Sequence, residues 1–305
     1  MRGLLTILLG ALCAAVAGGM LDGIVWPGTP LALFRPQLTL ALLAVTLVVL
    51  AIGPRRRAIV GIACVGLGGA LLVPALRLPE PEPPGVAQPT VRVLTLNLWN
   101  RNDNVSAVTE LIERERPDVV ALVELTPVWQ RALTSALRPY PIRAFEVASG
   151  SSGIGLYGRA PLRQPEIVRL GDGFRPSVEA RLELAGGVGR LLVVHPTPAL
   201  VPRDVDMHER ELAAIGEWAR RNGPRATVCG DLNASLWTRS LRDLLRVGDL
   251  RAALPGGLFA GSWPTVPPPF RVAVDGCLVG RGVRARADLG PRVGSDHLPV
   301  LVELG

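Results

Sequence analysis

Side chains able to do chemistry follow an apolar stretch late in the sequence. In Val228-Cys229-Gly230-Asp231-Leu232-Asn233, a carboxylate and a carboxamide stand two residues apart after a short apolar run. If the run is a strand that continues through Asn233, both side chains lie on one face, because alternate residues point the same way. Asp231 can take a proton or a cation, and Asn233 can donate and accept hydrogen bonds without titrating. Taken alone, these residues suit a turn with local backbone bonds even better than a site.

The same placement recurs at the ends of other apolar runs, and this favours a site. The residues concerned are Asn97, Glu124, His195, Asp275, Asp296 and His297. Together they supply carboxylates, carboxamides and imidazoles, and the sequence has no serine or cysteine nucleophile motif. Such a set suits a hard divalent cation, Mg²⁺ with Mn²⁺ as the alternative, held by one or two carboxylates, substrate phosphate and water. It also suits attack of water on a phosphoester.

Each of these residues also has an ordinary structural explanation. Asn97 and Asp296 could cap a helix or turn, Glu124 could lie in a solvated loop, and Asp275 could pair with an Arg. Their convergence in one crevice therefore depends on the elements that carry them.

From Val91 onward the hydrophobic pattern predicts many strands and few helices. One predicted helix begins at Val105 and ends before Pro117. The other predicted helices cover 127–137, 205–221 and 239–246. Predicted strands cover 91–96, 119–123, 142–147, 154–158, 166–170, 178–184, 190–195, 226–229, 271–279 and 298–303. Runs of strands interrupted by a few helices indicate an α/β domain with two packed sheets and helices outside.

Residues 1–76 read as a membrane domain with three transmembrane helices. The apolar runs 3–20, 37–53 and 58–76 are near the length of about 20 residues that crosses a bilayer core. They are apolar all round, whereas a core helix of a soluble protein is amphipathic. A lone signal peptide does not explain three such runs. Arg-rich short loops stay in the cytoplasm, so Arg55, Arg56 and Arg57 predict a cytoplasmic N-terminus and an extracytoplasmic C-terminal domain.

Residues 77–90 (RLPEPEPPGVAQPT) form a Pro-rich linker, which suits a stiff spacer between the membrane and a catalytic domain over 91–305. We therefore expect a multi-pass protein of the cell membrane, present as a monomer.

Composition limits the class of partner only weakly. The formal net charge is +7, and every basic residue is Arg. A basic balance favours anionic partners such as phosphate, nucleic acid or lipid headgroups, but the C-terminal region has no dense basic run. Aromatic residues make up 4% of the chain, which disfavours a nuclease that stacks bases on aromatic side chains. Trp263 could line a site entrance or simply pack in a loop.

The four cysteines show no metal-ligand spacing. Cys13 and Cys64 lie in apolar runs and are expected to be small buried side chains. For Cys229 and Cys277, in predicted strands, we favour two free buried thiols. A disulfide between them stays open if this region lies outside the cytoplasm.

Seven segments together resemble the endonuclease/exonuclease/phosphatase superfamily. They are LTLNLW (94–99), PDVVALVEL (117–125), GIGLYGRAPL (153–162), VVHPTP (193–198), CGDLNAS (229–235), VAVDGCLV (272–279) and GSDHLPV (294–300). The resemblance covers roughly 91–304 and implies a four-layer α/β/β/α sandwich of two mostly antiparallel sheets. With three spans ahead of it, the chain resembles the membrane-attached bacterial branch of that superfamily.

The resemblance also implies a role for each site residue. Glu124 matches the metal-binding glutamate, Asn97 the asparagine beside it, and Asp296 a second acidic residue of the metal site. Asp231 matches the aspartate that activates or positions water, and Asn233 the asparagine that orients it. His195 and His297 match the two histidines that contact the phosphoryl group, and Asp275 the aspartate that orients His297.

Two positions depart from the family pattern. Val123 replaces a Gln that commonly precedes the glutamate, and Gly276 replaces a His or Tyr, which would widen the local pocket. The expected activity is hydrolysis of a phosphoester such as a lipid headgroup, a small phosphodiester or a nucleic acid. The alternative is a non-catalytic membrane-bound binding module of the same fold.

Overall fold

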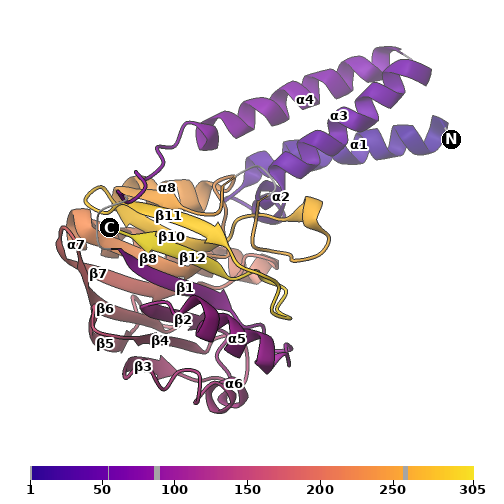
Figure 1. Ribbon diagram of the computed structural model, residues 1–305. Helices are drawn as coiled ribbons and strands as arrows, with labels where there is room; N and C mark the ends of the chain where they lie inside the picture. The colour runs from indigo at the N-terminus through magenta and orange to yellow at the C-terminus, as the bar shows by residue number, and fades with distance from the viewer. Residues whose placement is uncertain (1, 54, 86–89, 257–259) are drawn as a thin grey trace. The chain divides into compact units, whose positions relative to one another are not determined.

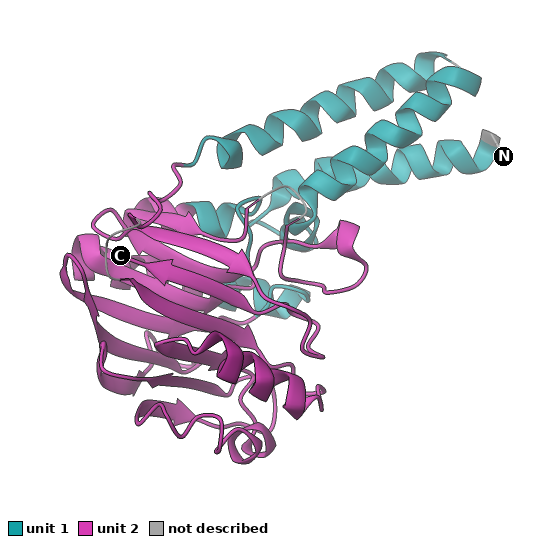
Figure 2. Cartoon of the chain, in the orientation of Figure 1, with its two compact units in different colours: residues 1–78, 198–209, 234–242 teal, residues 79–197, 210–233, 243–305 magenta. Residues whose placement is uncertain are grey.

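The computed structural model describes residues 2–53, 55–85, 90–256 and 260–305, which form two compact units (Figure 2). Unit 1 comprises residues 1–78 together with two later segments, 198–209 and 234–242. Unit 2 comprises 79–197, 210–233 and 243–305.

Unit 2 is built on two sheets of six strands (Figure 1). The first sheet has the order β11-β12-β1-β2-β4-β3, and the second has the order β5-β6-β7-β8-β10-β9. The first sheet consists of β1 (Val91–Asn97), β2 (Val119–Val123), β3 (Ile142–Glu146), β4 (Ile154–Gly158), β11 (Ala285–Leu289) and β12 (Val300–Leu304). The second consists of β5 (Leu162–Val168), β6 (Ser177–Leu184), β7 (Gly187–Val194), β8 (Ala226–Asp231), β9 (Leu250–Ala253) and β10 (Asp275–Gly280).

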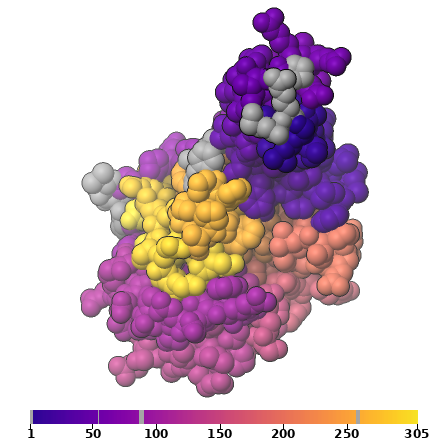
Figure 3. Space-filling model, turned by 90° about the vertical axis from the view of Figure 1, so that its right-hand side faces the viewer, coloured from indigo at the N-terminus to yellow at the C-terminus, as the bar shows by residue number. Residues whose placement is uncertain are grey.

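The pairing is antiparallel except at one place in each sheet. β1 pairs in parallel with β2, and β7 pairs in parallel with β8. In the space-filling view of Figure 3, the C-terminal residues in yellow border those near residue 100 in purple, as expected from the pairing of β12 with β1. Mostly antiparallel sheets that each contain one parallel pair confirm the predicted fold.

The core lies between the two sheets, because both present an apolar face to it. Val93, Ala121 and Leu156 of the first sheet join Val193 and Cys229 of the second in one buried cluster. The outer face of the first sheet is covered by α5 (Val105–Glu115) and α6 (Pro127–Ala132), whose buried residues pack with those of β1 and β2. On the second sheet's side lie α7 (Val205–Asn222) and α8 (Arg239–Gly248) (Figure 1). Helices on both outer faces complete the four layers.

Side-chain caps begin both helices on the first sheet. Asn104 caps α5, because its side chain accepts a hydrogen bond from the Ala107 amide. Thr126 caps α6 in the same way through the Trp129 amide. α6 ends at Ala132, earlier than the helix predicted over 127–137, and turns follow it.

Several strands differ from the sequence expectations, and β5 begins at Leu162 although the predicted strand began at 166. β9 and β11 were not expected, because LRAA and ARADL are short edge strands without strong apolar alternation. β10 starts at Asp275 and not at 271, because Val272 forms an isolated bridge to Trp263 instead of joining the sheet. The late start leaves Asp275 at the very beginning of its strand.

Unit 1 contains three helices that are long and apolar enough to cross a membrane, at Gly3–Leu21, Arg35–Ile52 and Arg55–Leu76. They correspond to α1 (Arg2–Gly18) with the 3-10 turn η1 (Gly19–Leu21), α3 (Arg35–Ile52) and α4 (Arg55–Leu76), and a short helix α2 (Gly28–Leu33) precedes α3. A Cβ atom on Gly61 or Gly68 of α4 would meet the side chains of Thr46 and Thr39 of α3. Small residues at this contact let the two helices approach closely.

Cys229 and Cys277 form a disulfide, with their Cα atoms 4.1 Å apart. The expectation of two free thiols was therefore wrong. The physical reason is register, since Cys229 of β8 lies directly opposite Cys277 of β10 in the antiparallel pair. Sequence patterns do not fix which strands become neighbours.

Candidate active site

The topology brings the chemistry-bearing strand ends to one edge of unit 2. Asn97 ends β1 and Glu124 follows β2, while His195 follows β7 and Asp231 ends β8. Strands of a parallel pair finish at the same edge of a sheet. β12 and β10 run antiparallel to β1 and β8, so their first residues lie at that edge too. Asp275 and the Asp296-His297 pair therefore arrive at the start of their strands.

Asp231 is at the centre of the site. Its Oδ2 atom accepts a hydrogen bond from Asn97 Nδ2 at 3.0 Å, and its Oδ1 atom accepts one from the Asn233 amide at 2.9 Å. The Nε2 atoms of His195 and His297 lie 3.5 and 3.8 Å from Oδ2. The side chain of Asp231 is buried, so few water molecules weaken these interactions.

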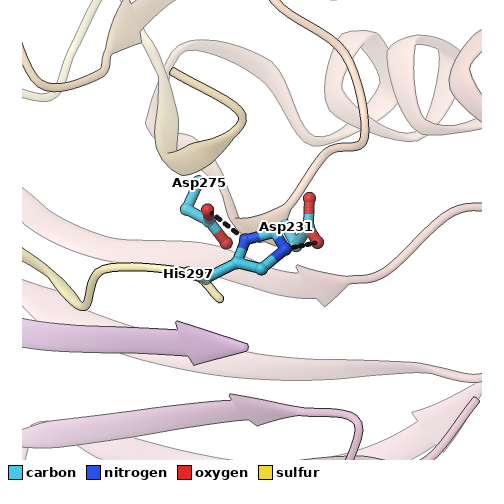
Figure 4. A group of neighbouring side chains, drawn as sticks. All are labelled: Asp231, Asp275 and His297. Atoms are coloured by element: carbon cyan, nitrogen blue, oxygen red, sulfur yellow. Dashed lines mark hydrogen bonds and ion pairs between the residues drawn. The ribbon is translucent and has the colours of Figure 1, made fainter. Parts of the chain in front are cut away.

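Asp275 and His297 form a buried carboxylate–imidazole pair (Figure 4). The distance from Asp275 Oδ2 to His297 Nδ1 is 2.7 Å. Burial by itself lowers the pKa of His297, but the carboxylates of Asp275 and Asp231 outweigh burial and raise this pKa to about 10. His297 is therefore an imidazolium at neutral pH, with Nε2 turned toward Asp231.

His195, in contrast, is a neutral imidazole at neutral pH. Burial is the largest cause that lowers its pKa to about 4, and the Arg175 guanidinium lowers it further against the opposing effect of Asp231. Arg175 Nη1 lies 3.4 Å from His195 Nδ1. Because a guanidinium only donates hydrogen bonds, we assign the proton of the neutral ring to Nε2, on the side of Asp231.

Glu124 lies next to this group through Asn97. Asn97 Nδ2 is 3.3 Å from Glu124 Oε1, and the Asn100 amide donates to Glu124 Oε2 at 2.9 Å. Burial raises the pKa of Glu124, and the hydrogen bonds from Asn100 and Asn97 oppose the rise. The backbone φ of Glu124 is 55°, a left-handed value that costs a non-glycine residue about 1–3 kcal/mol and often marks functional sites.

Asn233 has a similar left-handed backbone, with a φ of 49°. Its Nδ2 atom donates to the Pro196 carbonyl at 2.9 Å, which joins the residue after β8 to the loop after His195. The preceding Gly230 has a φ of 137°, and a Cβ atom there would lie 2.1 Å from the Val194 carbonyl oxygen. The glycine is needed because β7 approaches β8 closely just before Asp231.

Asp296 is held on the same edge by a tryptophan. Trp263 Nε1 donates to Asp296 Oδ2 at 3.2 Å, and the Trp263 ring centroid lies 6.2 Å from that of His297. Ser295 links the segment to β1, since its hydroxyl donates to the Asn97 carbonyl at 2.7 Å and accepts from the His297 amide at 3.0 Å. Of the two interpretations of Trp263, the structure supports a place beside the site.

The carboxylates of the site fit a divalent cation. Among the described residues, Asp296 Oδ1 is buried and has no hydrogen-bond partner, and a buried carboxylate oxygen of this kind needs a cation or a donor. Asp231, Asp275 and His297 also offer ligand-type atoms within 4.8 Å of one another. His297 Nδ1 and Asp275 Oδ2 already pair with each other at 2.7 Å, so Asp296 Oδ1 is the more available carboxylate oxygen for a cation.

Sequence reasoning missed some contributors and misjudged one. Arg175 was not singled out, although an Arg just before the predicted strand 178–184 was visible; its guanidinium is held by the Ser151 carbonyl and hydroxyl. Ser295 was noted only as part of a motif. Gly276 was expected to widen a pocket, and this was wrong. A Cβ atom there would meet the Ala253 carbonyl and Leu254, because Gly276 faces the neighbouring strand β9.

Comparison with known proteins agrees with this geometry. Residues 94–297 match the model of the Endonuclease/Exonuclease/phosphatase family. No curated protein sequence matches the chain. Among solved structures, a humanized D. rerio TDP2 with 14 mutations is similar at a TM-score of 0.58 and 16% identity, over 71% of this chain and 99% of that chain.

Two bacterial structures are similar in the same way. Sphingomyelinase C from Streptomyces griseocarneus has a TM-score of 0.53 and 17% identity, over 70% of this chain and 99% of that chain. A mutant beta toxin from Staphylococcus aureus with bound magnesium ions has a TM-score of 0.56 and 13% identity, over 70% and 99%. At these identities the likeness establishes the fold alone.

Proposed function

The chain belongs to the endonuclease/exonuclease/phosphatase family, and from this premise we propose that it is a membrane-anchored, divalent-metal-dependent phosphoester hydrolase that uses an activated water. The observation that carries the proposal is the buried pair of Asp275 and His297 facing Asp231, with Asn97 joining Asp231 to Glu124. This arrangement combines an acceptor for a proton with a fixed cationic donor.

In the proposed reaction, Asp231 accepts a proton from water while the water oxygen forms a bond to phosphorus. The ester bond between phosphorus and the departing alcohol breaks, and the alcohol oxygen keeps the electron pair. It ends protonated by the proton that Asp231 took from water, which returns through solvent. His297, charged because Asp275 raises its pKa, donates a hydrogen bond to a phosphoryl oxygen as negative charge develops there. His195 stays neutral and donates from Nε2, and Asn233 orients the water.

Glu124 and Asp296 would hold the cation, and Asn97 would position the Glu124 carboxylate. A bound divalent cation neutralises charge on the phosphoryl oxygens. Mg²⁺ is the cation we propose, since the available donors are carboxylate oxygens, and Mn²⁺ is the alternative. The bound magnesium ions in the similar Staphylococcus aureus structure support this choice.

We further propose that unit 2 works outside the cytoplasm. The Arg cluster at 55–57 favours a cytoplasmic loop between the second and third spans, which puts the chain after the third span on the other side. The disulfide between Cys229 and Cys277 supports this, since disulfides persist in oxidising compartments and are rare in the cytoplasm.

The test is hydrolysis of bis(4-nitrophenyl) phosphate, a soluble phosphodiester, by the purified full-length chain in detergent. We expect activity with Mg²⁺, loss of activity with a chelator, and recovery when Mg²⁺ or Mn²⁺ is added back. Asp231→Asn and His297→Ala should each lower kcat by about 10²–10⁴-fold. Asp288→Asn is the matched control, because Asp288 is a surface aspartate on β11.

Full activity in the chelated protein, or in Asp231→Asn, would contradict the mechanism. Absence of turnover together with absence of divalent-metal binding by calorimetry would favour the non-catalytic binding module.

A further inference from the structure

The first transmembrane helix ends in a loop with unusually exposed apolar side chains. The apolar helix Gly3–Leu21 is followed by Ile24, Val25 and Trp26, whose exposed fractions are 64%, 46% and 43%. In a chain with three spans, a loop that begins one residue after a span lies at the surface of the bilayer. Tryptophan is enriched at that depth, because its ring is apolar and its N–H is polar.

A segment from the C-terminal part of the chain joins this loop. Trp26 Nε1 donates to the Leu200 carbonyl at 3.1 Å, and segment 198–209 belongs to the same compact unit as the transmembrane helices. Leu200 and Val201 are also exposed, at 49% and 40%. We call residues 24–26 with Leu200 and Val201 the interfacial patch.

The base of the interfacial patch is fixed by buried polar contacts within unit 1. Arg35, at the start of the second span, is buried and donates to the Gly19 carbonyl at 2.8 Å and to the Trp237 carbonyl at 2.7 Å. Asp22 accepts a hydrogen bond from the Arg239 amide. Segment 234–242 is thereby tied to the outer ends of the first two spans.

Both tied segments leave directly from residues of the candidate active site. Pro198 is three residues after His195, and Ala234 is the residue after Asn233. The chain therefore passes from catalytic side chains to the bilayer surface within a few residues in two independent places. A solvated loop would serve a simple tether equally well, and it would not need exposed leucine and valine at this point.

The bilayer itself is the occupant that explains the interfacial patch. Ile24 lies three residues after the last residue of the first span, and Leu200 is joined to this loop by Trp26, so the surface that covers the end of the span also covers the patch. Arg203, two residues beyond Val201, has a side chain that is 87% exposed. A long cationic side chain beside an interfacial apolar segment suits phosphate groups of lipids.

We propose that the interfacial patch inserts into the outer interface of the bilayer and that the substrate is a phosphodiester carried by a membrane phospholipid, an inference that rests on the hydrolase function proposed above. Water adds to the lipid phosphorus and one of its two ester bonds breaks. The products are an alcohol and a phosphomonoester, one of which stays in the membrane.

The experiment compares two substrates with full-length protein reconstituted in vesicles of phosphatidylcholine and phosphatidylglycerol. Hydrolysis of the vesicle phospholipids is followed by ³¹P NMR, which detects the phosphomonoester whichever ester bond breaks. Hydrolysis of soluble bis(4-nitrophenyl) phosphate is followed by absorbance in the same preparation. The variant is the double substitution Leu200→Ser with Val201→Ser, outside the catalytic set. The matched control is Val188→Ser, an exposed valine at the other end of β7 from His195.

We expect wild type and Val188→Ser to hydrolyse both substrates. The double variant should lose at least tenfold on vesicle phospholipid and stay within twofold of wild type on the soluble ester. The proposal is overturned if wild type cleaves only the soluble ester, if the double variant keeps its phospholipid rate, or if both of its rates fall together. Absence of hydrolysis of either substrate by wild type would instead remove the proposed hydrolase function itself.

Discussion

Two histidines of the same site carry different charges, and their neighbours decide which. The carboxylates of Asp275 and Asp231 outweigh burial and raise the pKa of His297 to about 10. Burial lowers the pKa of His195 to about 4, with Arg175 adding to the decrease and Asp231 opposing it. At physiological pH the His297 ring is therefore a cation that can donate hydrogen bonds, and the His195 ring is neutral. The charge of each histidine therefore depends on its surroundings, which include Asp275 for His297 and Arg175 for His195.

Asp275→Asn should move the alkaline limit of activity to lower pH. The carboxylate of Asp275 favours the imidazolium, so its loss lowers the pKa of His297 from about 10 toward the ordinary value. The check is the pH dependence of kcat at saturating Mg²⁺, with Asp288→Asn as control. An unchanged alkaline limb would show that His297 does not act as a cation.

The raised pKa of His297 also makes the stability of the folded protein depend on pH. His297 holds its proton more tightly in the folded protein than at its ordinary pKa of 6.5. Its stabilising contribution is therefore complete below pH 6.5 and is lost as the pH rises toward about 10.

Sequence alone located the candidate site residues because strand ends are visible as breaks in apolar runs. Asn97, Glu124, His195 and Asp231 were all found in this way, and the structure brings them together. The protonation states of His195 and His297 could not be predicted from the sequence, since they depend on distances between residues far apart in the chain. Arg175 and Ser295 were missed for the same reason, because their contacts connect separate loops.

At the scale of elements, the disulfide joins the two strands that carry Asp231 and Asp275. Cys229 lies two residues before Asp231 on β8, and Cys277 lies two residues after Asp275 on β10. The bond therefore closes a loop of 48 residues immediately behind the catalytic pair.

Replacement of both Cys229 and Cys277 by alanine should lower the free energy of unfolding by about 2–4 kcal/mol, because the unfolded chain regains the freedom that the crosslink removes. Thermal melting of the full-length protein measures the effect. A reducing agent under denaturing conditions should destabilise wild type and leave the double variant unchanged. Equal melting temperatures for the two proteins would exclude a stabilising role.

Arg35 is the second element-scale link, since it connects the start of α3 to segment 234–242. Arg35→Gln should remove the guanidinium donor of the Gly19 carbonyl, at a cost of about 1–3 kcal/mol for a buried group. The Trp237 carbonyl would keep the Arg242 guanidinium as its donor but lose its link to α3. We expect faster trypsin cleavage after Arg239 in the full-length protein. Arg55→Gln, at the start of α4, is the control. Cleavage at the wild-type rate would mean that Arg35 does not hold the segment.

Elements were predicted well where the apolar pattern was strong, as in β1, β2, α5 and the three spans. Edge strands β9 and β11 escaped because little of either strand is strongly apolar. The sequence also did not predict which strands pair, and so it did not predict the disulfide. Pairing between strands 48 residues apart produces no periodic pattern in the sequence.

At the scale of the whole molecule, three crossings by the helices Gly3–Leu21, Arg35–Ile52 and Arg55–Leu76 would place the two ends of this region on opposite sides of a membrane. The loop after the first helix and the chain after the third would then share a side, as the contacts of Asp22, Trp26 and Arg35 with segments 198–209 and 234–242 require. An even number of spans would separate these partners.

A reporter that is active only outside the cytoplasm should therefore be active when it is fused after Gly305, and inactive when it is fused between the second and third spans. Substituting Glu for Arg55, Arg56 and Arg57 should weaken the orientation, because it removes the positive charge that keeps this loop inside. A cytoplasmic signal from the C-terminal fusion of the unaltered protein would refute the extracytoplasmic assignment.

The composition of unit 1 has one more consequence, for proteolytic shedding. A cut in the Pro-rich stretch after Leu78 would separate the three long apolar helices from the rest of the chain. The released piece would leave behind Trp26, Arg35 and Asp22, the partners of two of its own segments. Shedding would thus yield a fragment in which the segments that follow His195 and Asn233 have lost these hydrogen bonds.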